Sequence, residues 1–219
     1  MNSQREVIYT RRRHALYGER IQLDVANMLY DLSETIINAN YGNVEYEEFN
    51  LELIRAISME APFTEKEFFE KKSEELVEIL FDSMMDMYNR KMGTIAQQAF
   101  PVIKDVYEKQ SGQYENIVVP ISDGQKVFQI VTNLKKSYES NGRELVKSFN
   151  KAGILVSIDE NWKEHLREMD ELKQSVQNAT YEQKDPLLIY KFESYNLFRS
   201  LIEQVNREVS ALLLKAHIP

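Results

Sequence analysis

Apolar residues recur at intervals of three or four over most of the chain, and the strongest such pattern lies between residues 141 and 178. The positions that share this face follow one another without a gap: Leu155, Ile158, Trp162, His165, Met169, Leu172 and Val176. This spacing is typical of a helix packed lengthwise against another helix. The sequence therefore predicts a long helix here, with a partner of similar length.

A second long helix is predicted directly after a short polar loop. Asp185 has a side chain preferred at the helix N-cap, and Pro186 suits the first helical position, where its missing N–H is no loss. A wide apolar face follows: Leu188, Phe192, Tyr195, Phe198, Ile202, Val205, Val209 and Leu212. A short loop favours antiparallel packing, so Tyr181 would stand at the tip of a helical hairpin. Its ring either contacts a partner there or folds back and caps the hairpin.

Residues 1–40 are predicted to form one helix, in which Gly18 is the only interruption. Five positions of its second half share one face: Ile21, Val25, Met28, Leu32 and Ile36. In the first half the apolar residues are too sparse to hold a helix to this chain's own core. That half is either a solvated helix end or a surface for a partner.

Shorter elements are predicted between residues 41 and 140. A helix over 47–59 precedes a capping box at Thr64–Glu67, which starts the next helix. A similar motif at Thr94–Gln97, directly after Gly93, predicts a break or kink in that helix. Two β-branched runs within residues 114–134 flank the turn sequence Ser-Asp-Gly-Gln and indicate a β-hairpin, with Pro120 on an edge strand. The fold class is therefore mainly α, with a long helical hairpin and a small β-hairpin.

Composition narrows the class of protein. The 219 residues are 43% hydrophobic, enough for a real core, and the net charge of −8 disfavours nucleic acid as a partner. Zero cysteines fit a reducing compartment and exclude disulfides. No apolar run approaches the roughly 20 residues of a membrane span. A soluble chain is expected.

The motifs of catalysis are missing from the sequence. No glycine-rich phosphate-binding loop is present, so nucleotide binding by this chain alone is not expected. The histidines lie far apart and none has metal-ligand spacing: His14, His165 and His217. His165 is interpreted as a core residue of the helical seam, and Trp162 beside it as a packing anchor. We expect no catalytic residue, metal or cofactor in this chain.

Two stretches resemble one known family. The first runs Trp162-Lys163-Glu164-His165-Leu166, Met169-Asp170-x-Leu172-x-Gln174, Tyr181-x-Gln183-Lys184-Asp185-Pro186 and Tyr190-x-x-Glu193. It resembles the two-helix finger of SecA, the bacterial motor ATPase that translocates preproteins. The second, Met1-Asn2-x-Gln4-Arg5-Glu6-Val7-Ile8-Tyr9 with Arg12, is similar to that family's long scaffold helix.

The resemblance implies three parts: residues 1–40 as the distal scaffold helix, 41–140 as a helical wing domain, and 141–219 as the finger with the end of the scaffold. It implies contact with the preprotein and a SecY-type channel at the fingertip, through Thr180, Tyr181, Glu182, Gln183 and Lys184. It also implies docking to the parent motor domains through Gln4, Arg5, Tyr9 and Arg12. Trp162, His165, Met169 and Pro186 would be structural anchors.

In that family the motor domains bind ATP and magnesium, and the finger restrains ATP turnover. The resemblance therefore implies a C-terminal fragment that does not hydrolyse ATP itself, in a protein of the cytoplasm that lies peripherally on the inner face of the plasma membrane. Two features depart from the family pattern. The β-hairpin has no counterpart in the wing, and the Gly-Ile-His-Leu-Arg run before the tip is absent. The alternative is a free-standing helical adaptor whose hairpin binds a partner helix.

Overall fold

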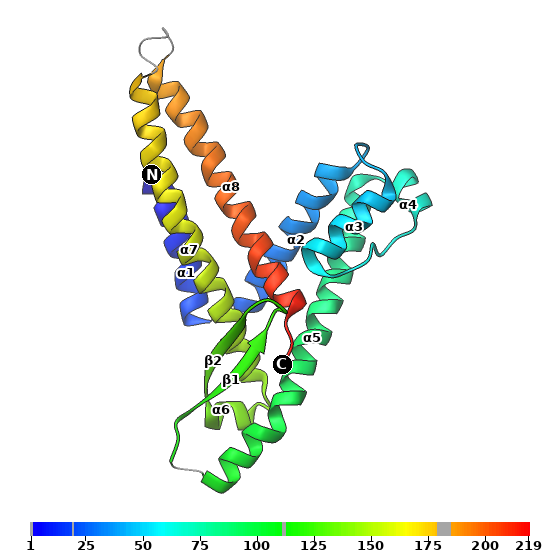
Figure 1. Cartoon of the computed structure of the whole chain (residues 1–219), viewed down its shortest axis with the longest axis vertical. Coiled ribbons are helices and arrows are strands. Elements are labelled where there is room, and N and C mark those ends of the chain that lie inside the picture. The colour runs from blue at the N-terminus through cyan, green and yellow to red at the C-terminus, as the bar shows by residue number, and fades with distance from the viewer. Residues whose placement is uncertain (1, 19, 111–112, 179–184) are drawn as a thin grey trace.

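The computed structural model describes residues 2–18, 20–110, 113–178 and 185–219, and the predicted mainly α fold is confirmed (Figure 1). The helices are α1 (Asn2–Tyr17), α2 (Ile21–Asn40), α3 (Tyr46–Ile57), α4 (Glu65–Glu70), α5 (Ser73–Gln110), α6 (Leu134–Glu139), α7 (Arg143–Asn178) and α8 (Pro186–Lys215). Two antiparallel strands, β1 (Asn116–Ser122) and β2 (Val127–Asn133), form the β-hairpin.

The helical hairpin has the predicted arrangement. Helices α7 and α8 run antiparallel and side by side, and α8 starts as its sequence indicates (Figure 1). The side chain of Asp185 accepts hydrogen bonds from the backbone N–H groups of Leu187 and Leu188, and Pro186 occupies the first turn. These bonds satisfy two donors that have no partner inside the helix.

The prediction of one helix over residues 1–40 was wrong, because the chain bends between α1 and α2. Gly18 has a φ of +71°, and its N–H bonds to the carbonyl of His14. Glycine enters this left-handed region without a Cβ clash, and it commonly ends a helix in this way. Helix α1 therefore lies along α7, whereas α2 diverges toward α5 and α8 (Figure 1).

Helix α1 is also held by this chain's own core, contrary to expectation. Ile8 and Ala15 are fully buried, and the helix packs on α7. Polar contacts to the hairpin add to this packing, through Gln4 to His165 and through Arg12 to Asp159. The few apolar residues of α1, which were expected to be too sparse to hold the helix, therefore form its contact with α7.

The capping box at Thr64 is confirmed, with the side chains and backbone N–H groups of Thr64 and Glu67 bonded reciprocally. The helix that it starts is short, however, and α5 is a separate helix. The predicted break after Gly93 was wrong, since α5 continues through it. The Thr94 hydroxyl donates to the carbonyl of Arg90 one turn earlier, so it bonds within the helix instead of capping a new one.

The β-hairpin closes between Ser122 and Val127 and leans on α7, as predicted for an otherwise marginal ribbon. The outer edge of β1 is covered at one point, where the N–H and carbonyl of Ser122 pair with those of His217. Continued in the same register, this pairing would set Pro120 opposite Pro219. Neither proline has an N–H to donate, so the bridge stays isolated.

Candidate functional site

The centre of the helical hairpin is an aromatic cluster built on the predicted anchors. The rings of Trp162 and His165 stack with centroids 5.3 Å apart, and Phe198 of α8 meets His165 edge-on at 5.9 Å. His165 and Met169 are buried, while Trp162 is half-buried. The structure therefore brings Trp162, His165 and Met169 together and places Pro186 at the distal end of α8.

Helix α1 is bonded to this cluster through Gln4. Its side-chain N–H group donates to the backbone carbonyl of Ser194 at 3.0 Å, and its Oε1 lies 3.2 Å from Nε2 of His165. Because Oε1 can only accept, Nε2 of His165 carries the proton. One glutamine thus joins α1 to both helices of the hairpin.

The other ring nitrogen of His165 is left without a partner. Nδ1 is buried and accepts no hydrogen bond from any described residue. Burial lowers the pKa of His165, since a charged imidazolium here would lose its hydration and gain no counter-charge. His165 is therefore a neutral, buried packing residue of the hairpin.

A second set of contacts fixes the C-terminal half of α1. Arg12 donates two hydrogen bonds to the carboxylate of Asp159 on α7, at 2.8 and 3.1 Å, and these bonds raise the pKa of Arg12. Arg11 donates to Asn206 Oδ1 of α8 at 3.4 Å, and Asn206 donates to Asp31 of α2 at 3.0 Å. Helix α1, the hairpin and α2 are thereby linked across the bend at Gly18.

The four residues expected to dock the motor do not share one environment. Gln4 and Arg12 contact the hairpin, whereas Arg5 and Tyr9 are exposed, Tyr9 by 51%. Their docking role stays a prediction. The tip residues Thr180, Tyr181, Glu182, Gln183 and Lys184 lie outside the described residues, so the structure adds nothing to that prediction.

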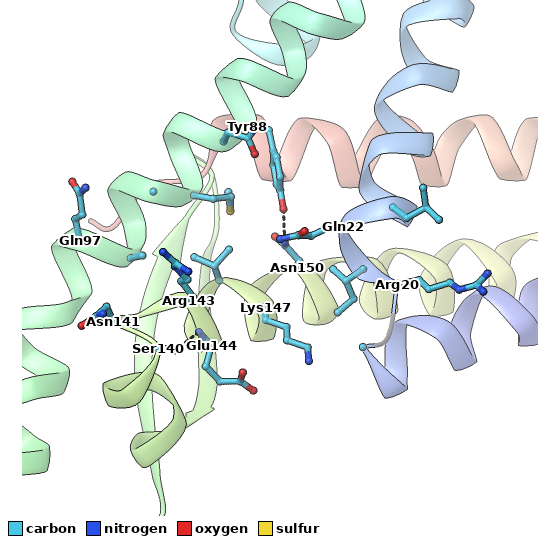
Figure 2. Close-up of a pocket in the computed structure, with 18 residues that line it drawn as sticks. Arg20, Gln22, Tyr88, Gln97, Ser140, Asn141, Arg143, Glu144, Lys147 and Asn150 are labelled. Atoms are coloured by element: carbon cyan, nitrogen blue, oxygen red, sulfur yellow. Dashed lines mark hydrogen bonds between the residues drawn. The ribbon is translucent and has the colours of Figure 1, made fainter.

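Two features of the site were missed from the sequence. The apolar face of α8 does not all pack on α7, because near the distal end Leu188, Phe192 and Tyr195 are 63–66% exposed. The only signal was the width of that face, which exceeds what one partner helix covers. The second feature is a pocket of about 930 Å³ between α2, α5 and the start of α7 (Figure 2).

Within the ranges that the structure describes, no three His, Asp or Glu side chains gather in a way that could hold a metal ion. The helices of those same ranges include none that is both long enough and apolar enough to cross a bilayer.

A long helical hairpin, braced along its flank by α1 and joined at its base to a helical lobe, defines a helical scaffold module. The sequence profile of the SecA Wing and Scaffold domain matches residues 1–217, and the chain belongs to this family. It is 55% identical over its whole length to the protein translocase subunit SecA of Parabacteroides distasonis and 53% identical to that of Porphyromonas gingivalis. The chain spans about one fifth of these relatives, 19% and 20% respectively.

Proposed function

We propose that this chain is the scaffold, wing and finger part of a protein-translocating motor ATPase. The hairpin of α7 and α8 engages an unfolded preprotein at the mouth of a SecY-type channel, and its attachment to α1 transmits the state of the motor. The parent motor domains supply ATP and magnesium. The work takes place on the cytoplasmic side of the bacterial plasma membrane.

The bracing of the hairpin by α1 is the observation that carries this proposal. Gln4 joins α1 to α7 and α8 near the middle of the hairpin, and Arg12 joins α1 to α7 closer to the base. Contacts at two points stop α1 from pivoting on the hairpin, so the three helices move as one body. A force applied to α1 is then delivered at the tip.

The outward face of α1 provides the place where that force is applied. Arg5 and Tyr9 are exposed one turn apart on the flank of α1, beside its buried Ile8. A tyrosine ring with a neighbouring arginine is a common anchor of protein interfaces. The proposal assigns this face to the motor domains, where it restrains or releases ATP turnover as the hairpin moves.

At the other end, Tyr181 contacts the moving polypeptide. A tyrosine offers a rigid apolar ring and a hydroxyl at low entropic cost, which suits contact with chains of varied sequence. The test replaces Tyr181 with alanine in the full-length protein and measures ATP-driven transport of a preprotein into channel-bearing vesicles. Tyr114→Ala, a 56% exposed tyrosine beside the β-hairpin, is the matched control.

We expect transport to fall at least about tenfold for Tyr181→Ala, which corresponds to roughly 1.4 kcal/mol of lost coupling, and to be unchanged for the control. Equal transport by both variants removes the tip from the mechanism. The second candidate, a helical adaptor, is favoured by the exposed stripe of Leu188, Phe192 and Tyr195, which has the spacing of a helix-binding face. It predicts that Phe192→Ser abolishes partner binding while Tyr181→Ala does not.

A further inference from the structure

The pocket at the base of the hairpin contains a buried polar pair that is only partly satisfied. Asn150 of α7 is 2% exposed and Tyr88 of α5 is 5% exposed, and the Asn150 amide donates to the Tyr88 hydroxyl (Figure 2). The amide oxygen of Asn150 has no hydrogen-bond partner among the described residues. Buried polar atoms in native proteins nearly always have a partner, so this one points to a bound water or ligand.

The pair lacks both a donor and an acceptor, whichever way the amide is oriented. As drawn, the oxygen of Asn150 needs a donor and the O–H of Tyr88 needs an acceptor. If the amide is turned around, the tyrosine donates to its oxygen, and the amide N–H group and the phenol oxygen are left over. Burial raises the pKa of Tyr88, so its hydroxyl keeps its proton at neutral pH. A ligand hydroxyl, which donates and accepts through one atom, fits the pair in both orientations.

The charged residues that line the pocket are mostly cations, although the protein is acidic. Arg143 and Lys147 project from the first turns of α7, and Arg20 lies at the start of α2, against the single carboxylate of Glu144. The chain as a whole carries a net charge of −8. The start of a long helix adds a partial positive charge at the same place. These charges favour an anion beside the buried pair.

Helices α5 and α7 approach each other closely at one end of this pocket. Gly142, with a φ of +83°, lets α7 begin so close to α5 that an added Cβ would lie 2.7 Å from the carbonyl oxygen of Ala96. Ile21, Met92 and Val146 supply the apolar part of a lining that is otherwise largely polar. A volume of about 930 Å³ is large for the pair alone and accommodates a small molecule.

We propose that this pocket binds a small polyol phosphate, whose hydroxyl group bonds to Asn150 and Tyr88 and whose phosphate lies between Arg143 and Lys147. A phosphate alone would pair with the cations but would leave Asn150 and Tyr88 without a hydrogen-bond partner. A neutral polyol would bond to Asn150 and Tyr88 but would leave the cations without an anion. The chemistry is shared by free sugar phosphates and by the glycerophosphate headgroup of an anionic lipid, and the site is independent of the translocation proposal.

The test titrates the purified protein by calorimetry with glycerol 3-phosphate, glucose 6-phosphate, inorganic phosphate and glycerol. We expect one of the two polyol phosphates to bind with a Kd below about 1 mM, at least about tenfold tighter than phosphate or glycerol. Arg143→Gln combined with Lys147→Gln should weaken this binding at least tenfold. Lys163→Gln with Arg167→Gln, two exposed cations at the same spacing on the same helix, is the control and should change nothing.

Tyr88→Phe tests the buried end without removing packing volume. It should weaken the polyol phosphate by about tenfold and leave the weak binding of inorganic phosphate unchanged. Vesicles of phosphatidylglycerol and of phosphatidylcholine distinguish a lipid headgroup from a free sugar phosphate as the ligand. Binding to the first alone, lost in the Arg143/Lys147 variant, identifies the lipid headgroup. The proposal is overturned if no polyol phosphate binds in free or vesicle form, if phosphate binds equally well, or if the two double variants behave alike.

Discussion

Gln4 and His165 are 161 positions apart in the sequence, yet Oε1 of Gln4 lies 3.2 Å from Nε2 of His165. The same glutamine donates to the carbonyl of Ser194, so a single side chain bridges three helices. The contact fixes the proton on Nε2 of His165 and orients the ring against Trp162. Helix α1 is thereby held at the aromatic centre of the hairpin. A displacement of α1 would disturb hydrogen bonds to both α7 and α8.

Removal of this bridge should loosen α1. Gln4→Ala leaves the buried N–H of His165 without an acceptor, and we expect the free energy of unfolding to fall by about 1–2 kcal/mol. Urea denaturation followed by circular dichroism measures the change. Gln98→Ala, at an exposed position of α5, removes the same side chain from another helix and should alter stability by less than about 0.5 kcal/mol. Equal effects would show that the bridge contributes nothing.

The buried His165 also predicts a pH dependence. Its pKa is lowered by burial from an ordinary value near 6.5, so between the folded and unfolded pKa values the unfolded state binds more protons. The free energy of unfolding is therefore highest above pH 6.5, where the ring is neutral in both states. It falls as the pH drops below 6.5 and through the lowered pKa of the folded state. Wild type should therefore lose more stability than His165→Gln, which keeps a donor for Gln4, when both are denatured at pH 7.5, 6.5 and 5.5. Parallel stability curves would contradict this.

The helical hairpin could be predicted because its signals are local. The seam of α7 repeats every three or four residues, and Asp185 with Pro186 defines the start of α8 without reference to any other element. Bends in the other helices could not be predicted in this way. Gly18 ends a helix and Gly93 does not, although glycine costs a helix about 1 kcal/mol at either place. The difference lies in the packing of α1 on α7, which no local pattern contains.

In the candidate site, too, the residues on a local repeat could be predicted and the contacts between distant helices could not. Trp162, His165 and Met169 were identified because they lie on one periodic stripe. The family resemblance implies that Gln4 and Arg12 dock other domains, and nothing in their own helix indicates partners on α7 and α8. The pocket pair of Tyr88 and Asn150, 62 positions apart, has no sequence signal at all. Contacts between helices that are remote in sequence depend on how the elements pack.

Two glycines should respond in opposite directions to the same substitution. Gly142→Ala forces a residue with a Cβ into a left-handed conformation and against a backbone oxygen, so we expect a loss of about 2 kcal/mol or more. Gly93→Ala, where no described atom comes within 4 Å of the added Cβ, should gain about 0.5–1 kcal/mol in the interior of α5. Thermal unfolding of both variants measures the difference. A stabilised Gly142→Ala variant would refute the close contact between α5 and α7.

The two roles proposed for α1, packing on the hairpin and contact with the motor domains, can be tested separately at Ile8 and Tyr9. Ile8 is 1% exposed against the hairpin, and Ile8→Ala should cost about 2–4 kcal/mol of unfolding free energy through the cavity that it leaves. Tyr9→Ala removes an exposed ring and should change the stability of this chain by less than about 0.5 kcal/mol. In the full-length protein, however, Tyr9→Ala should alter the basal ATPase rate, because the proposed motor contact is lost while the hairpin stays intact. Steady-state ATP hydrolysis, with Tyr114→Ala as the control for loss of an exposed tyrosine, measures this. An unchanged rate would assign the outer face of α1 to solvent.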